Sequence, residues 1–271
     1  MKIFLYALLL PALLLFDPYP LYAQEVIAFR SAQSQHDEIG IPGFPRPRDN
    51  LTRARARTEL GALYFQSGNW IVALEELTLA ISADPTFAPA YGLRGLVLFQ
   101  VNENESAEQD FRRALRLNEN DPETNNNFGW FLCQTGRAAE SLRYFQRAIR
   151  NPMYRTPESA LLNLGACYLR IGELDLAEEN IRRGLRLAPG NPSGLFHLAN
   201  IHYERGNYAA AQQQLIEVVR DNVPNAETLW LFWRVERRLN NRAAAESLLT
   251  QLRRKYPDSR EYQEFLKGNF E

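Results

Sequence analysis

Small and apolar residues recur every 34 positions from about residue 54 onward. One column is mostly glycine and reads Gly61, Gly95, Gly129, Gly165, Ala199 and Trp233. A second column of small residues reads Ala73, Ala107, Ser141, Ala177, Ala211 and Ala245. Four residues later a large apolar column reads Leu77, Phe111, Phe145, Ile181, Leu215 and Leu249. One step is two residues longer than the others, which places an insertion near 155–157. A fixed period of this length predicts stacked copies of one supersecondary unit.

Each unit is predicted to be a hairpin of two antiparallel helices. Gly68, Gly136, Gly172 and Gly206 fall where the turn between the two helices is expected. Small residues allow the helices of one hairpin to cross closely, and large ones fill the gap to the next hairpin. One hairpin cannot bury its own apolar face, so stability comes from stacking.

The period and the pattern of small and large residues resemble the tetratricopeptide repeat. The resemblance implies an all-α superhelical solenoid of six helix hairpins, ending in a short capping helix near 261–265. The body spans 51–266, followed by a tail at 267–271. The six repeats are expected at about 54–87, 88–121, 122–157, 158–191, 192–225 and 226–259.

The N-terminus has the pattern of a secretory signal peptide over 1–23. Lys2 precedes an apolar run, Ile3–Phe16, which is too short to span a bilayer of about 30 Å as a helix. Prolines follow, and then a small residue, Ala23, after which we expect cleavage and export. The alternative is an uncleaved anchor. The proline- and glycine-containing stretch 24–50 is expected to be a flexible tether.

Composition and charge exclude several classes of function. With 31 basic and 32 acidic residues the formal net charge is −1, which argues against binding nucleic acid through bulk charge. No catalytic or nucleotide-binding motif is present. His197 and His202 lie five residues apart, an unsuitable spacing for a shared metal, so we interpret them as packing residues. We therefore expect no enzyme activity, metal, cofactor or small-molecule substrate.

The remaining candidate is a protein-binding surface along the first helices of the hairpins. One exposed column reads Phe65, Phe99, Cys133, Leu169 and Tyr203, and its neighbour reads Gln66, Gln100, Gln134, Arg170 and Glu204. Three glutamines at the repeat spacing predict a ladder of amides that could pair with the backbone of an extended peptide. Leu96, Asn126 and Trp130 are expected beside it. Alternatively, the two phenylalanines pack against neighbouring helices and the glutamines are only solvated.

The two cysteines, Cys133 and Cys167, fall on the first helices of adjacent repeats. Their positions differ by two residues in register, and adjacent helix axes lie about 8–10 Å apart. Export would permit oxidation. The sequence therefore predicts a disulfide, with two buried free thiols as the alternative.

Three segments carry a more specific resemblance: NNNFGWFLC at 125–133, RARTELGALYFQSGNWIVALEEL at 55–77, and KYPDSREYQEF at 255–265. Over about 51–266 the chain resembles the type IV pilus biogenesis and stability proteins, the PilF/PilW family. That resemblance implies a periplasmic adaptor at the outer membrane of a Gram-negative bacterium. It implies that the protein binds the pilus secretin, or other pilus assembly proteins, and promotes secretin assembly or pilus stability. The family's first repeats offer an apolar groove. The matching residues here are Tyr64, Phe65, Trp70, Leu96 and Phe99, although Tyr64 and Trp70 equally fit packing within the hairpin.

One departure from the family concerns the membrane anchor. Family members commonly carry a lipobox cysteine at the cleavage site, whereas the first cysteine in this sequence is Cys133. We therefore expect either a soluble periplasmic protein or one held at the inner membrane by an uncleaved N-terminal segment. Outer-membrane association would then depend on the partner. The competing hypothesis is a scaffold for another envelope process, such as cell division or outer-membrane protein assembly.

Overall fold

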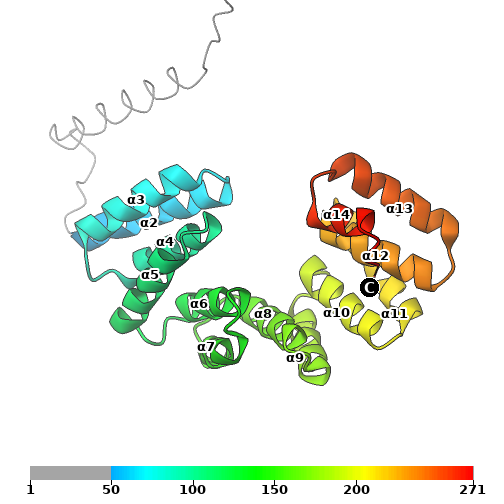
Figure 1. Cartoon of the computed structure of the whole chain (residues 1–271). Coiled ribbons are helices and arrows are strands. Elements are labelled where there is room, and N and C mark those ends of the chain that lie inside the picture. The colour runs from blue at the N-terminus through cyan, green and yellow to red at the C-terminus, as the bar shows by residue number, and fades with distance from the viewer. Residues whose placement is uncertain (1–49, 271) are drawn as a thin grey trace, which may run out of the picture. The chain divides into compact units, whose positions relative to one another are not determined.

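The computed structural model describes residues 50–270, and these form thirteen helices and no strand. The predicted signal peptide and nearly all of the predicted tether lie outside the described residues. Six hairpins follow one another in chain order, and a short helix closes the series (Figure 1). This confirms the all-α tetratricopeptide solenoid of six hairpins with a capping helix.

Every hairpin pairs an even-numbered first helix with an odd-numbered second helix. They are α2 (Asn50–Gln66) with α3 (Trp70–Ala83), α4 (Ala88–Gln100) with α5 (Asn104–Leu117), α6 (Pro122–Gln134) with α7 (Ala138–Arg150), α8 (Pro157–Arg170) with α9 (Leu174–Leu187), α10 (Pro192–Glu204) with α11 (Tyr208–Asp221), and α12 (Ala226–Arg238) with α13 (Arg242–Lys255). The capping helix is α14 (Arg260–Leu266).

Local sequence explains where the first helices begin. Pro122, Pro157 and Pro192 occupy the first position of α6, α8 and α10, where a missing N–H costs nothing. The side chain of Asp121 also caps α6, because its Oδ2 accepts a hydrogen bond of 2.8 Å from the N–H of Thr124. The predicted insertion lies just before α8, which starts eight residues before Gly165, whereas α4, α6, α10 and α12 each start seven residues before the same column.

The turn inside each hairpin requires a left-handed backbone. The four predicted glycines adopt it, for example Gly136 with φ of 86°. In the second and sixth hairpins the same place is taken by Asn102 (φ 65°) and Asn240 (φ 59°). Asparagine is the residue after glycine that tolerates this region best, which is why these turns lacked the glycine signal.

Replacing Gly136 with alanine should therefore destabilise the protein by about 1 kcal/mol, because a β carbon is disfavoured at this φ. Asn102→Gly, the opposite change at the equivalent turn, should leave stability equal or slightly higher. Urea unfolding of both variants tests the pair. An alanine variant as stable as the unmodified protein would contradict the assigned turn geometry.

The glycine column lies where the two helices of a hairpin cross. A β carbon at Gly165 would come within 2.5 Å of Ile181 Cγ1 and 3.0 Å of the carbonyl oxygen of Ala177. At Gly129 it would meet the ring of Phe145 at 2.9 Å. These approaches are closer than ordinary contacts of a β carbon, so a side chain at either position would force the facing residues to shift. The large residue of each second helix fills the space that the glycine leaves.

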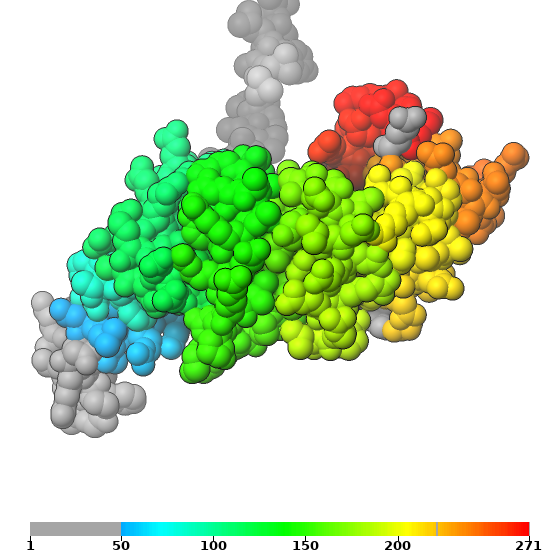
Figure 2. Space-filling model, turned by 90° about the horizontal axis from the view of Figure 1, so that it is seen from below, coloured from blue at the N-terminus to red at the C-terminus, as the bar shows by residue number. Residues whose placement is uncertain are grey.

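Neighbouring hairpins stack through their first helices. Each first helix contacts the next one as well as the preceding second helix, whereas no extensive contact joins successive second helices of the described chain. The first helices therefore form the inner face and the second helices the outer face. The colours of the space-filling view change in chain order, with each hairpin next to its sequence neighbours (Figure 2).

One stacking column shows this directly. Val97, Phe131, Cys167, Ile201 and Val235 occupy equivalent positions and are all at most 2% exposed. The equivalent residue of the first hairpin, Leu63, is 62% exposed because no described hairpin precedes it. At the other end α14 covers the last hairpin. Trp233, which breaks the glycine column, stacks on Trp230 and meets Phe265 of α14, with ring centroids 4.6 and 5.5 Å apart.

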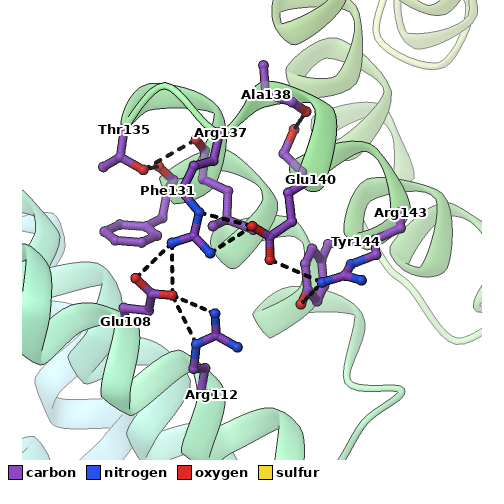
Figure 3. A network of polar contacts seen from close by, with 11 residues as sticks. Glu108, Arg112, Phe131, Thr135, Arg137, Ala138, Glu140, Arg143 and Tyr144 are labelled. Atoms are coloured by element: carbon purple, nitrogen blue, oxygen red, sulfur yellow. Dashed lines mark hydrogen bonds and ion pairs between the residues drawn. The ribbon is translucent and has the colours of Figure 1, made fainter.

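A polar network connects the second and third hairpins on the outer face (Figure 3). Arg137, just before α7, donates to both carboxylate oxygens of Glu108 on α5 at 2.9 Å and to Glu140 at 2.7 Å. Arg112 and Arg143 extend the network on either side. Burial alone would raise the pKa of Glu108, but hydrogen bonds from Arg137 and Arg112 outweigh it and leave the pKa below its usual value. The network thus adds polar contacts to the apolar cluster that joins the same two hairpins.

Candidate inner-face binding site

The inner face is built from side chains that the first helices do not use for packing within the hairpin. Its central column, one residue after the glycine column, reads Ala62, Leu96, Trp130, Ala166, Asn200 and Arg234. All except the buried Ala166 are partly exposed. The column is thus apolar in the second and third hairpins and polar in the fifth and sixth.

Besides Leu96 of α4, the first two hairpins bring four of the predicted residues to this face. Phe99 is half-buried and meets Phe131 of the next hairpin edge-on, with ring centroids 5.3 Å apart. Phe65 is likewise half-buried, against the cluster that includes Leu77 and Val97. Both rings therefore contribute to packing. Gln66 and Gln100 are exposed, and neither amide forms a hydrogen bond within the described residues.

In the third hairpin the predicted residues are more firmly held. Asn126 is 6% exposed, and its Oδ1 accepts a hydrogen bond of 3.0 Å from Asn163 on α8. Gln134 accepts one of 3.3 Å from Arg170. Trp130 and the half-buried Leu96 pack at the edges of two apolar clusters. The amide ladder therefore has two free members, at 66 and 100, and one engaged member.

Cys133 of α6 and Cys167 of α8 are joined by a disulfide. Their Sγ atoms are 2.13 Å apart and their Cα atoms 5.9 Å apart, and both residues are fully buried. The hydroxyl of Ser141 lies 3.1 Å from Cys167 Sγ. The bond links the third hairpin to the fourth, across the repeat boundary that contains the insertion.

A cavity of about 270 Å³ lies between α10, α12 and α14. Ten residues line it: Phe196, Asn200, Glu227, Trp230, Leu231, Arg234, Arg260, Glu261, Glu264 and Asn269. None of them was among the site residues predicted from the sequence. The central column aligns two of the lining residues, Asn200 and Arg234, with Leu96 and Trp130, but the repeat period gives no signal for the contact of α14 that completes the cavity.

The described residues contain no group of three or more histidine, cysteine, aspartate or glutamate side chains that could hold a metal. His197 and His202 belong to the packing of α10, and Nδ1 of each is buried without a hydrogen-bond partner. Burial lowers the pKa of His197 to about 4. Burial also lowers the pKa of His202. Both groups are therefore neutral at pH 7.

This shift gives the protein a defined sensitivity to acid. The pKa of His197 is about 4 in the folded protein, below the ordinary value of 6.5 that applies to the unfolded chain. Between these values the unfolded chain binds a proton and the folded protein does not, so the folded state keeps its full stability only above pH 6.5. That stability is lost as the pH falls towards 4, by up to about 3 kcal/mol. His197→Gln should flatten this part of the stability profile, measured by urea unfolding between pH 7 and 4. Parallel profiles for the two proteins would contradict the assignment.

Among the described residues, no helix is both long and apolar enough to cross a bilayer.

The tetratricopeptide repeat family matches four segments of the chain, at residues 88–121, 127–192, 197–222 and 234–259. These segments fall within the second to sixth predicted repeats, and the first predicted repeat corresponds to the hairpin of α2 and α3 in the structure.

The chain is also similar to proteins of type IV pilus biogenesis. The type IV pilus assembly protein PilF of Pseudomonas aeruginosa is 30% identical over 210 residues, which cover 78% of this chain and 83% of PilF. A solved structure of PilW, described as a widely conserved type IV pilus biogenesis factor, superposes with a TM-score of 0.70 at 32% identity, covering 79% of this chain and 98% of that one. The solved P. aeruginosa PilF superposes with a TM-score of 0.69 at 29% identity, covering 81% and 99%.

Proposed function

Because the chain belongs to the tetratricopeptide family of type IV pilus biogenesis proteins, we propose that it is a non-enzymatic adaptor that binds the pilus secretin. In this proposal the protein acts in the periplasm and is recruited to the outer membrane by its partner. Binding to the inner face favours assembly of the secretin ring or stability of the pilus. No bond is made or broken in this mechanism.

The observation that carries the proposal is the free amide pair at the N-terminal end of the inner face. Gln66 and Gln100 lie one repeat apart, are exposed and make no hydrogen bond within the described residues. Beside them the half-buried rings of Phe65 and Phe99 offer apolar surface. An extended segment presents backbone N–H and C=O groups, so amides can hold it without requiring a particular sequence.

The protein should therefore lose affinity for the secretin when both amides are removed. For Gln66→Ala with Gln100→Ala we expect roughly fivefold to thirtyfold weaker binding, because each lost hydrogen bond costs about 0.5–1 kcal/mol. The measurement is binding of the purified protein to the periplasmic region of the secretin from the same genome.

The matched control makes the same changes on the outer face, at Gln109 and Gln146, which are also exposed helix residues. This double variant should bind normally. If the two double variants bind the secretin equally well, the two amides are not part of the binding site. If the unmodified protein does not bind the secretin at all, a scaffold for another envelope process becomes the better account.

A further inference from the structure

The cavity at the C-terminal end of the inner face has opposite charges at its two ends. Glu227, Trp230 and Arg234 line it from one face of α12, at relative positions 1, 4 and 8. Seven residues of α helix rise about 10 Å, so the carboxylate and the guanidinium originate about that far apart. Trp230 lies between them, and Phe196 and Leu231 add apolar wall.

Two carboxylates line the acidic end, together with Arg260, which directly precedes Glu261 in the chain. Glu227 lies in the first turn of α12 and Glu261 in the first turn of α14, and neither forms an ion pair within the described residues. Burial, together with repulsion from Glu261, raises the pKa of Glu227. Glu264, the third acid of the lining, is already engaged: hydrogen bonds from Asn269 and Lys267, and the charge of Arg260, lower its pKa.

The basic end also holds a buried polar atom without a partner. Nε of Arg234 is buried and forms no hydrogen bond within the described residues. The guanidinium lies over the ring of Tyr203, with its carbon 4.3 Å from the ring centroid, and this contact restrains its position. Asn200 of α10 lines the same cavity, so donors from two adjacent helices converge.

The combination of acid, aromatic ring and base is specific to the sixth hairpin. The equivalent triplets of the other first helices are Arg55, Thr58 and Ala62; Pro89, Gly92 and Leu96; Glu123, Asn126 and Trp130; Ser159, Leu162 and Ala166; and Ser193, Phe196 and Asn200. The repeat pattern therefore does not require it. A solvated helix surface would not need the aromatic floor, nor would it leave a buried donor unpaired.

We propose that this cavity binds an extended segment of the partner protein that carries one basic and one acidic side chain three residues apart. The basic side chain contacts Glu227 and Glu261, and the acidic one contacts Arg234 and Asn200. Three residues of polyproline II, the extended conformation with three residues per turn, rise about 9 Å and bring both side chains to the same side of the segment, which matches the separation along α12. The inference rests on the proposed function, because it assigns a specificity to the same inner face.

The test uses blocked synthetic octapeptides and the purified protein. The probe GSKTVESG has the proposed spacing, GSKETVSG places the two charges next to each other, GSKTVKSG carries two bases, and GSQTVQSG is uncharged. Binding is followed by the NMR signal of the Trp230 indole N–H, assigned by a Trp230→Phe variant. We expect GSKTVESG to bind roughly fivefold more tightly than each other probe, since a well-placed ion pair at a partly exposed site is worth up to about this factor.

Arg234→Glu makes both ends of the cavity acidic and should reverse the preference, so that GSKTVKSG becomes the tightest of the four. Arg253→Glu, an equal charge change at an exposed position of α13, should leave the order unchanged. The inference is overturned if the four probes shift the indole signal equally or not at all, or if the order survives Arg234→Glu. If the secretin binds normally in either of those cases, the proposed function stands and only the assigned specificity is lost.

Discussion

Phe145→Ala is expected to lower the free energy of unfolding by about 3–5 kcal/mol, the usual cost of emptying a buried phenylalanine site. The side chain is fully buried and packs with Cys133, Leu164 and Cys167 in one apolar cluster. Its ring occupies the space opposite Gly129, so neither helix of the hairpin can move in to fill the void. Urea unfolding followed by circular dichroism measures the loss.

A second substitution tests the physical reason. Gly129→Ala alone should destabilise the protein by about 1–3 kcal/mol, because its β carbon would overlap the Phe145 ring. In the Phe145→Ala background that overlap disappears, and alanine should be neutral or stabilising since it is the better helix former. Strictly additive costs in the double variant would show that the glycine column does not set the distance between the helices.

Removing the disulfide should be the other large effect. The bond closes a loop of 34 residues, for which the chain-entropy model gives about 3–4 kcal/mol. Cys133→Ala with Cys167→Ala should therefore unfold at much lower urea concentration than the oxidised protein. The cost includes a small packing loss, since both positions are fully buried.

The control is the unmodified protein unfolded under reducing conditions, in which the same loop is open. It should approach the stability of the double variant. If oxidised, reduced and doubly substituted proteins unfold together, the bond does not constrain the chain. Mass spectrometry after alkylation without reduction supplies the complementary test, with no alkylated cysteine expected in the oxidised protein.

The hairpins were predictable because each repeat applies the same steric rule. Glycine at 61, 95, 129 and 165 faces a large residue of the second helix, and this pairing is visible in the sequence as two columns of fixed spacing. The turns at Asn102 and Asn240 do not show in the glycine pattern, because asparagine also adopts the left-handed region although it is common elsewhere in the chain. Nothing in the spacing alone separates such an asparagine from a solvated one.

The site was only partly predictable, since exposure on the inner face depends on the neighbouring hairpin. Gln100 and Gln134 share a column, yet only Gln134 has Arg170 within hydrogen-bond distance on the next first helix. The cavity depends on α14 lying against α12, a contact that the period does not specify. Arg234 and Asn200 could be aligned with Trp130 and Leu96, but their shared cavity could not be derived from that alignment.

The most direct test of the account is the amount of heat-stable secretin multimer in envelopes of a strain that lacks this protein. The deletion strain is compared with strains complemented by the unmodified protein and by the Gln66→Ala, Gln100→Ala variant. We predict that multimers fall and monomers accumulate in the deletion strain. The unmodified protein should restore the multimers, and the variant should restore them only in part. Unchanged multimers in the deletion strain would contradict a role in secretin assembly.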